Sequence, residues 1–278
     1  ILGKTKDLPA LLKRSQNYRN VIWPEKSFAW VRMPDGSWME NFEPVAGEFG
    51  PRGFCESSAS VSTFFVPHDP PGLASLLGGP QAAADHLDAI MTKAEPLRFL
   101  PGEAHGRGHA SAWVDYSNQD SCGMAHYFNR IGFPWLSQKW VRRVHELVFA
   151  DTTPYGGYNG DEDQGQMGSL SALMALGLFQ FDGGCAVRPS YEITAPLFDR
   201  IIIQLDPKTY GPDRSFTILA RNQAPENVYI QSARLNGKPL TQCSIYHQDL
   251  VQGGTLELEL GPQPNKNWGV GKSELAVQ

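Results

Sequence analysis

The sequence has little charge and lacks both a basic excess and any long hydrophobic run. Charged residues make up 19% of the 278 residues, below the roughly 25% typical of soluble domains. The formal net charge is −5, whereas a nucleic-acid-binding protein normally carries a basic patch. No apolar run approaches the roughly 18 residues that a membrane-spanning helix requires. We therefore expect a globular protein with neither a nucleic-acid partner nor a membrane span.

Several familiar catalytic and metal-binding motifs are also missing. The four cysteines are scattered and form no C-x-x-C pair, which excludes a zinc ribbon or a thioredoxin-type site and leaves the redox compartment open. The seven histidines show no H-E-x-x-H spacing, and no Walker motif or G-x-G-x-x-G follows a strand. A G-x-S-x-G elbow is absent as well. Zinc, nucleotide and serine-hydrolase chemistry are therefore poorly supported.

What the sequence does contain is glycine, proline and aromatic residues. It has 28 Gly, 21 Pro and seven Trp, and 11% of its residues are aromatic. High aromatic content with a small net charge argues against disorder. Residues 23–52 are rich in Pro, Gly and aromatic residues, which predicts a long structured loop, and loops of this length in compact domains are usually functional.

Helix signals dominate the first two thirds of the chain. Prolines in first turns and glycines after last turns mark several of the predicted boundaries. We expect helices over about residues 9–16, 54–65, 72–77, 80–94, 121–131, 134–149 and 161–178.

After residue 184 the pattern changes to strands. Leu256–Leu260 alternates apolar and polar residues, as a half-buried strand does, and Asn236-Gly237 is a strong hairpin signal. Further strands are expected over 201–203, 216–219 and 228–230. The fold class that we predict is mainly α over 1–184, followed by a small antiparallel β unit over 185–278.

The most unusual segment is Tyr155 to Gln166, which reads Y-G-G-Y-N-G-D-E-D-Q-G-Q. Asp161 and Asp163 are two positions apart, so an extended or turning backbone can point both carboxylates the same way. Two close carboxylates raise the pKa of one of them, which suits a general base that activates water. The alternative is an acidic first turn that stabilises a helix through its dipole.

A second segment places Glu56 among apolar and small residues. Burial there is expected to raise the carboxyl pKa, as a general acid requires. The alternative is a Glu near a helix N-terminus that pairs with a base. His68-Asp69, after Pro67, is interpreted as either a helix cap or a pair of site residues.

The third segment, Tyr116–Ser121, reads Y-S-N-Q-D-S and precedes a helix. Asn118 and Gln119 offer neutral amide oxygens beside an acid, and Ca²⁺ prefers such oxygen ligands. A cluster of Ser, Asn and Asp caps is the alternative interpretation.

These segments together resemble glycoside hydrolase family 92, the calcium-dependent exo-acting α-mannosidases, in its C-terminal catalytic portion. The resemblance covers nearly the whole chain, and the motifs occur in one order. They are F-F-V-P-H-D-P-P-G-L at 64–73, Y-S-N-Q-D-S at 116–121, G-Y-N-G-D-E-D-Q-G-Q-M at 157–167, P-L-F-D at 196–199 and G-G-T-L-E-L-E-L-G-P-Q-P-N-K-N-W-G at 253–269.

The resemblance implies an N-terminal β-sandwich, an (α/α)6 barrel and C-terminal strands. It implies removal of terminal α-mannose with inversion, for which an acid and a base roughly 6.5–9.5 Å apart leave room for water. By this similarity Glu56 is the general acid, and Asp161 and Asp163 form the general-base pair. The remaining implied roles are Ca²⁺ binding by Asn118, Gln119 and Asp163, and substrate binding by His68, Asp69 and Gln166.

This sequence departs from the family pattern beside two of these positions. Where the family often has E-G-x-x-W-Q-Y after its acid, this chain has E-S-S-A-S-V-S from Glu56. The usual N-(E/Q)-P-S reads N-Q-D-S from Asn118, with no His pair after it. The linkage that is cleaved therefore stays open.

Two other functions stay open on the sequence alone. One is a non-catalytic mannoside-binding protein on the same scaffold, in which Trp23, Trp30 and Trp38 stack on sugars. The other is a different (α/α)6 glycosidase or a phosphorylase.

The start and the length of the sequence favour a fragment. An (α/α)6 barrel has twelve helices, only about seven are predicted, and the sequence starts at Ile1 without a Met. We expect later barrel helices without the β-sandwich and the early helices, an exposed apolar helical face and little activity alone. The substrate class implies mannose-containing glycans as partners and a periplasmic or secreted location.

Overall fold

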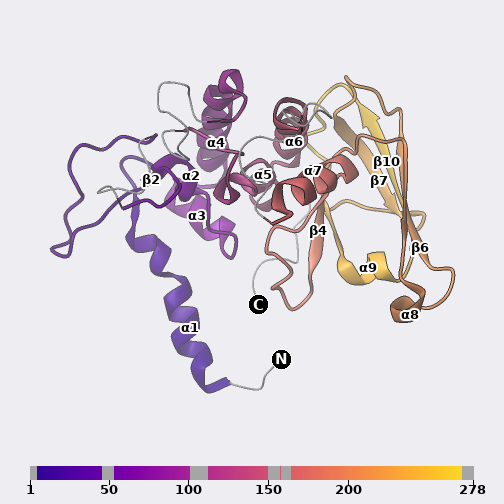
Figure 1. Ribbon diagram of the computed structural model, residues 1–278, viewed down its shortest axis with the longest axis horizontal. Helices are drawn as coiled ribbons and strands as arrows, with labels where there is room; N and C mark the ends of the chain where they lie inside the picture. The colour runs from indigo at the N-terminus through magenta and orange to yellow at the C-terminus, as the bar shows by residue number, and fades with distance from the viewer. Residues whose placement is uncertain (1–4, 46–52, 101–111, 150–156, 158–163, 271–278) are drawn as a thin grey trace. The chain divides into compact units, whose positions relative to one another are not determined.

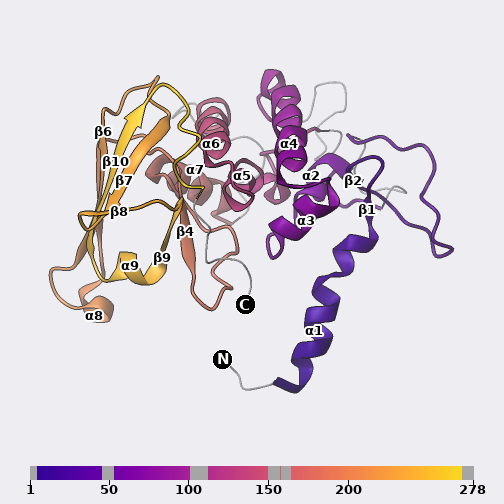
Figure 2. The same ribbon diagram turned by 180° about the vertical axis from the view of Figure 1, so that it is seen from behind.

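A computed structural model describes residues 5–45, 53–100, 112–149, 157 and 164–270. The chain forms two compact units, Ile1–Asp115 and Tyr116–Gln278. The first unit is mainly helical among its described residues, and the second combines helices with two β-sheets (Figures 1 and 2). The predicted change from helix to strand therefore lies within the second unit. None of the helices in the described ranges has the length and apolar character needed to cross a membrane.

The first unit is built from short helices around one small hairpin. Strands β1 (Ile22–Trp23) and β2 (Phe28–Ala29) pair antiparallel at the start of the segment that was predicted as a loop. The helices are η1 (Thr5–Asp7), α1 (Leu8–Ser15), η2 (Asn17–Asn20), α2 (Ala59–Thr63), α3 (Pro70–Leu76), α4 (Pro80–Ala94) and η3 (Glu95–Leu97).

Helix α4 confirms its predicted boundaries, because Pro80 occupies the first turn and Gly79 precedes it with a φ of 106°. Helix α1 confirms the prediction over 9–16 to within one residue at each end. It presents an apolar surface to solvent, since Leu8, Leu11 and Leu12 are 50%, 56% and 56% exposed. The expected apolar helical face is therefore present in the described chain.

Helix α2 is much shorter than the predicted helix over 54–65. Glu56 has a φ of 51°, and Ser58 has an extended backbone, so no helix can run through them. The Ser58 hydroxyl oxygen instead accepts the N–H of Val61 at 3.3 Å and caps a helix that begins at Ala59. Serine competes with the helical backbone for hydrogen bonds in this way, which is why it favours caps.

Helices in the second unit lie next to its sheets. The predicted helix over 121–131 is wrong in detail, because it divides into two 3-10 turns and a short α-helix. The elements are η5 (Gln119–Ser121), η6 (Met124–His126), α5 (Tyr127–Arg130), α6 (Pro134–Val148) and α7 (Gln166–Leu176). Helix α6 confirms its prediction, and α7 is capped by Gly177, where a Cβ would lie 2.4 Å from the carbonyl oxygen of Thr194.

The larger sheet has the strand order β5-β6-β10-β7-β8. Its strands are β5 (Arg200–Gln204), β6 (Ser215–Arg221), β7 (Tyr229–Leu235), β8 (Lys238–Pro239) and β10 (Gly254–Gly261), with α8 (Pro207–Tyr210) between β5 and β6. Strand β10 pairs parallel with β6, so the expectation of a purely antiparallel unit is wrong. Asn236 and Gly237 form the predicted hairpin turn between β7 and β8, both with positive φ.

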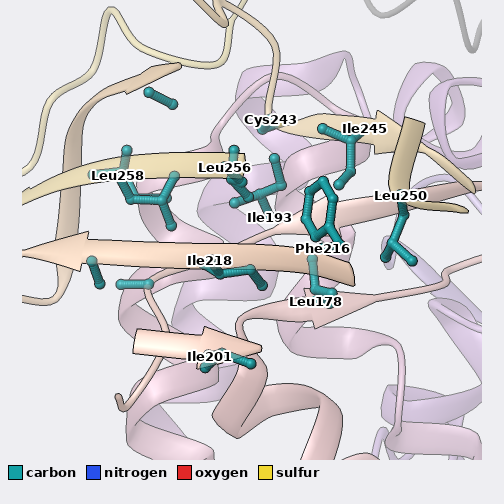
Figure 3. Close-up of a cluster of buried hydrophobic side chains, with 14 of the residues drawn as sticks. Leu178, Ile193, Ile201, Phe216, Ile218, Cys243, Ile245, Leu250, Leu256 and Leu258 are labelled. Atoms are coloured by element: carbon teal, nitrogen blue, oxygen red, sulfur yellow. The ribbon is translucent and has the colours of Figure 1, made fainter. Parts of the chain in front are cut away.

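A smaller sheet of order β3-β4-β9 adjoins the same core. It comprises β3 (Leu178–Phe179), β4 (Ser190–Ile193) and β9 (Ser244–Tyr246), and α9 (His247–Val251) follows it. Alternate residues of β6 and β10, such as Phe216, Ile218 and Leu256, point into this core with at most 1% exposure (Figure 3). Burial of each large side chain stabilises the fold by about 1.5–3 kcal/mol.

Candidate functional site

The described structure brings two of the predicted site segments together. Gln166, the first residue of α7, donates a hydrogen bond from Nε2 to the Sγ of Cys122 at 3.5 Å. Cys122 directly follows η5, which contains Gln119 and is capped by Asn118. Residues 44 positions apart in sequence therefore meet at the start of α7. Asp161 and Asp163, which precede Gln166 in the sequence, lie outside the described residues.

Asn118 has a local structural role at this junction. Its side chain is buried, and its Oδ1 accepts the N–H of Gln119 at 2.8 Å. This confirms the interpretation of Asn118 as a cap, which is compatible with a ligand role because an amide oxygen has two lone pairs. Ca²⁺ binding by Asn118 and Gln119 stays a prediction.

A buried tyrosine, Tyr116, holds the loop around Asn118 in place. Tyr116 is fully buried, and its hydroxyl oxygen accepts the N–H of Ala125 at 3.1 Å. Burial raises the pKa of Tyr116, so the hydroxyl stays neutral. Since this bond closes residues 116–125 into a compact loop, Asn118 and Gln119 are presented on a well-supported backbone.

Glu56 lies in the first unit on a strained turn. Its backbone is in the left-handed region at a φ of 51°, which costs a non-glycine residue about 1–2 kcal/mol. Strained residues of this kind cluster at active sites. Glu56 is partly exposed, so the condition of burial among apolar residues is only partly met.

Buried serines next to Glu56 hold this turn in place. The hydroxyl of Ser58 donates to the carbonyl oxygen of Ala112 at 2.9 Å, and that of Ser60 donates to the carbonyl oxygen of Trp113 at 2.7 Å. Both serines are at most 1% exposed. The run of serines that departs from the family pattern thus serves to attach the Glu56 turn to residues 112–113.

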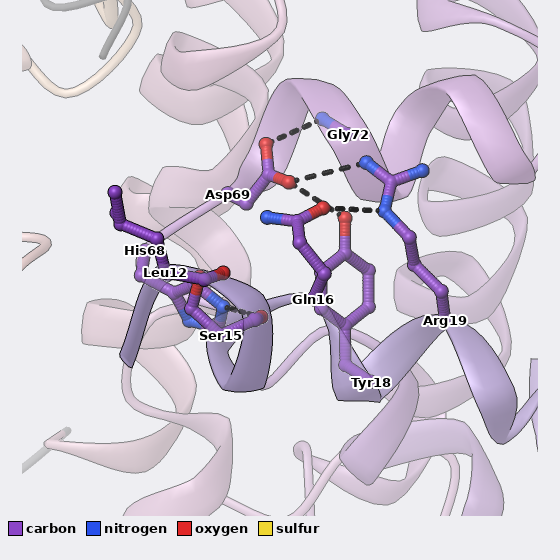
Figure 4. A network of polar contacts seen from close by, with 8 residues as sticks. All are labelled: Leu12, Ser15, Gln16, Tyr18, Arg19, His68, Asp69 and Gly72. Carbon is purple, nitrogen blue, oxygen red and sulfur yellow. Dashed lines mark hydrogen bonds and ion pairs between the residues drawn. The ribbon is translucent and has the colours of Figure 1, made fainter. Parts of the chain in front are cut away.

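His68 and Asp69 connect helices of the first unit (Figure 4). Asp69 caps α3 by accepting the N–H of Gly72 at 2.9 Å, and it also accepts from Tyr18 at 2.8 Å and from Arg19 at 3.3 Å. His68 Nε2 lies 2.8 Å from the carbonyl oxygen of Ser15. The capping interpretation of Asp69 is therefore confirmed, and substrate binding by this pair stays a prediction.

The contacts of Asp69 also set its charge state. Burial on its own raises the pKa of Asp69, but hydrogen bonds from the Tyr18 hydroxyl and the Gly72 N–H favour the carboxylate and lower the pKa overall. Burial raises the pKa of Tyr18, and the hydrogen bond to Asp69 raises it further. The pair is thus a neutral phenol donating to a carboxylate.

The three tryptophans proposed for sugar stacking are already buried or stacked on another ring. Trp30 is 2% exposed, and its indole N–H donates to the carbonyl oxygen of Met39. Trp23 and Trp38 stack on each other with ring centres 5.1 Å apart. Because an indole that is buried or already stacked offers less open ring surface, this cluster gives the binding-protein hypothesis no direct support.

Sequence reasoning missed a buried carboxyl group in the second unit. Glu192 on β4 accepts a hydrogen bond from Asn129 Nδ2 at 3.0 Å, and Arg130 Nε lies 3.7 Å from its other oxygen. Burial raises the pKa of Glu192 to about 8, an effect that Arg130 and Asn129 oppose. The only signal in the sequence was the apolar neighbour Ile193, and nothing in the sequence linked Glu192 to Arg130.

The oxygen donors near α7 fit calcium in chemical type. Asn118 and Gln119 supply neutral oxygens, and a complete Ca²⁺ site uses six to eight oxygen ligands. Within the described ranges, no three His, Cys, Asp or Glu side chains gather into a metal-binding group. The carboxylate expected for this site is that of Asp163, outside those ranges.

Each unit thus supplies candidate groups of its own: a partly exposed residue, Glu56, on a strained turn in the first unit, and amide oxygens beside a helix start in the second. Residues 1–262 match the glycosyl hydrolase family 92 catalytic domain. The chain belongs to this family, which confirms the resemblance drawn from the sequence motifs.

Individual relatives agree with this assignment. An uncharacterized secreted glycosidase from Arthroderma benhamiae is 33% identical over an alignment of 302 positions, covering 99% of this chain and 35% of the relative. An inverting family 92 mannosidase from Bacteroides thetaiotaomicron is 30% identical, with a TM-score of 0.77 over 97% of this chain and 36% of its own.

A family 92 α-mannosidase from Bacteroides thetaiotaomicron, solved with mannoimidazole, is 25% identical, with a TM-score of 0.80 over 97% of this chain and 34% of its own. The chain thus spans about a third of the length of these relatives.

Proposed function

We propose that this chain carries catalytic residues of an exo-acting α-mannosidase that removes terminal α-linked mannose with inversion. The observation that carries the proposal is the catalytic-domain match over residues 1–262. Glu56, Asp161 and Asp163 all lie inside that match. The solved relatives that are described as mannosidases support mannose-containing glycans as the substrate.

In the proposed reaction Glu56 donates its proton to the glycosidic oxygen as the bond to the anomeric carbon breaks. Asp161 and Asp163 orient a water on the opposite face of the sugar and accept its proton, so a single displacement inverts the anomeric centre. Partial exposure of Glu56 supports this role, because a general acid must reach the leaving oxygen.

Calcium is proposed as the cofactor of this site. Asn118, Gln119 and Asp163 would hold it, and the bound cation would polarise sugar hydroxyls and favour a distorted ring. The support is the oxygen-donor chemistry of these residues and the contact of Gln166 with Cys122, which joins α7 to the Asn118 loop.

The remaining proposals concern architecture and location. We propose that the described helices form part of an (α/α)6 barrel, which the solved family members support through their fold similarity to 97% of this chain. A secreted or periplasmic location is supported by the relative from Arthroderma benhamiae, which is described as secreted.

The test replaces the acid and the base separately in the full-length enzyme and measures mannose release from α-linked mannosides. Glu56→Gln and Asp163→Asn are expected to lower kcat by about a hundredfold or more, since general acid–base catalysis contributes about 10²–10⁴-fold. Glu25→Gln and Asp199→Asn change exposed carboxylates elsewhere and are the matched controls. Near-normal rates in Glu56→Gln would contradict the assigned role.

The same assay separates the rival functions. A non-catalytic mannoside-binding protein would bind mannosides without turnover, and its binding would be insensitive to loss of Asp161. A phosphorylase would require inorganic phosphate for turnover and would release a sugar phosphate. Mannose release without added phosphate, with the β anomer formed first from an α-mannoside, supports the proposed inverting hydrolase.

A further inference from the structure

A small cavity lies in the second unit where the β4–β9 pair ends. Its volume is about 270 Å³, slightly below the roughly 300–1,000 Å³ of most small-molecule sites. Its lining comes from the segment that enters β4 and from the start of α9, namely Val187, Arg188, Pro189, Tyr246, His247 and Gln248. This size suits a ligand no larger than a monosaccharide.

The two walls of this cavity are held together by backbone contacts. Ser190 and Tyr246 are paired across the β4–β9 ladder. The N–H of His247 donates to the carbonyl oxygen of Pro189 at 2.7 Å, and the N–H of Tyr246 donates to Asp249 at 3.1 Å. The cavity is therefore formed by ordered backbone before any ligand arrives.

One wall carries an arginine, Arg188, that has no acidic partner among the residues the structure describes. The guanidinium carbon of Arg188 lies 3.8 Å from the centre of the Tyr246 ring. None of the ion pairs found in the described part of the chain includes Arg188. Stacking on tyrosine orients a guanidinium, so its side chain loses conformational freedom before an anion binds. The guanidinium N–H donors match carboxylate or phosphate oxygens.

The other wall adds an oriented imidazole. His247 Nδ1 lies 3.2 Å from the hydroxyl oxygen of Tyr191, and this contact fixes the ring. Gln248 adds an exposed amide at the rim. The acid nearest in sequence, Asp249, already accepts the Tyr246 N–H. The one permanent charge among the side chains that line the cavity is therefore positive, and the amide beside it can donate hydrogen bonds.

We propose that this cavity binds the phosphate or carboxylate group of a monosaccharide-sized ligand, with Arg188 as the main partner of the anion. Arg188 donates to two oxygens of the anion from its position on Tyr246. His247 and Gln248 contact the same group or the adjoining sugar hydroxyls. The site requires no catalytic turnover, so its test is independent of the proposed mannosidase activity.

The experiment measures binding to the full chain by calorimetry at low ionic strength. Inorganic phosphate, mannose 6-phosphate and glucuronic acid are titrated separately, with neutral mannose as the uncharged comparison. Arg188→Met removes the charge and keeps the length of the side chain. Arg200→Met is the matched control, because Arg200 is also exposed and forms no ion pair in the described chain.

We expect the anions to bind with a Kd on the order of 1 mM, and Arg188→Met to weaken them about tenfold or more, as loss of a charged hydrogen bond does. Arg200→Met should leave the Kd unchanged. Equal binding of phosphate and mannose 6-phosphate would identify the anion alone as the ligand, and tighter binding of mannose 6-phosphate would identify the sugar phosphate. Anion binding that is absent, or unchanged in Arg188→Met, would overturn the proposal, as would equally tight binding of mannose.

Discussion

The large sheet of the second unit and the turns that carry the candidate site are held in different ways. The sheet is ordered by apolar residues at every second position, as Leu256, Leu258 and Leu260 show in β10. The turns at Glu56 and Asn118 are held by hydrogen bonds between side chains and the backbone: serine hydroxyls donate at the first, and the asparagine and tyrosine oxygens accept at the second. Stability and the placement of the candidate site residues therefore depend on different residues in this chain.

The largest expected effect follows from removing a core side chain of the sheet. Phe216 is fully buried in β6, so Phe216→Ala should lower the free energy of unfolding by about 3–5 kcal/mol through lost burial and a residual cavity. Denaturant unfolding measures this change. Ile202→Ala is the control, since Ile202 is 53% exposed on neighbouring β5; equal losses in the two variants would show that the sheet does not depend on its buried face.

This contrast also explains what the sequence could predict. Strands β6 and β10 and helix α4 follow from periodicity and from proline and glycine at their ends, and the sequence located them well. The parallel pairing of β10 with β6 was missed, because alternation shows that a strand exists but not which neighbour it joins.

The site was less predictable for a related reason. The sequence motifs identified Glu56, Asn118 and Gln166, but not the strained backbone of Glu56 or the contact of Gln166 with Cys122. Both features depend on side chains that meet only after folding. Local propensity favoured a helix through Glu56, and the buried hydroxyls of Ser58 and Ser60 prevailed over it.

A second prediction concerns the junction between helix and sheet. A Cβ at Gly177 would lie 2.4 Å from the carbonyl oxygen of Thr194, and the φ of Gly177 is 71°. Gly177→Ala should therefore destabilise the second unit by about 2–3 kcal/mol, from the left-handed backbone and the backbone contact together. Thermal unfolding measures the loss.

Gly183→Ala is its matched control. Gly183 also has a positive φ, 60°, but nothing lies within 4 Å of its Cβ position. Only the cost of a left-handed backbone conformation, about 1 kcal/mol, applies at Gly183. If both variants lose the same stability, close packing of Gly177 against Thr194 does not contribute to stability, and the prediction for Gly177 is wrong.

A third prediction uses pH to separate the buried polar cluster from the apolar core. Burial raises the pKa of Glu192 to about 8 from a usual value of 4.5. The folded state therefore holds the proton more tightly than the unfolded chain. The stabilisation is fully present below about pH 4.5, and it is lost as the pH rises through about 8.

Glu192→Gln removes this titration while keeping the shape of the side chain. The Tm of the wild type should fall by several degrees more than that of Glu192→Gln between pH 5 and 8. Glu257→Gln is the control and should follow the wild type, because the Glu257 side chain is 30% exposed beside Arg221 whereas that of Glu192 is 2% exposed. Parallel curves for wild type and Glu192→Gln would show that this carboxyl does not titrate with folding.

The smallest effect on stability, and the one that bears most closely on function, is expected at Cys122. Its sulfur accepts the hydrogen bond from Gln166 that joins α7 to the Asn118 loop, and sulfur is a weak acceptor. Cys122→Ala should therefore cost only about 1 kcal/mol of unfolding free energy. Cys122→Ser restores an acceptor, although a shorter one, and should recover part of any functional loss.

If this contact positions the Asn118 loop, Cys122→Ala should raise the Ca²⁺ concentration that gives half-maximal mannose release, with a smaller change at saturating Ca²⁺. A purely structural role would lower the Tm and leave that concentration unchanged. Cys243→Ala is the comparison, because Cys243 is similarly buried but lies in the core cluster of the sheets. Equal shifts in Ca²⁺ dependence for Cys122→Ala and Cys243→Ala would contradict a specific role for the Cys122 contact. A change in the core of the sheets would then perturb the Ca²⁺ site as much as loss of a direct contact does.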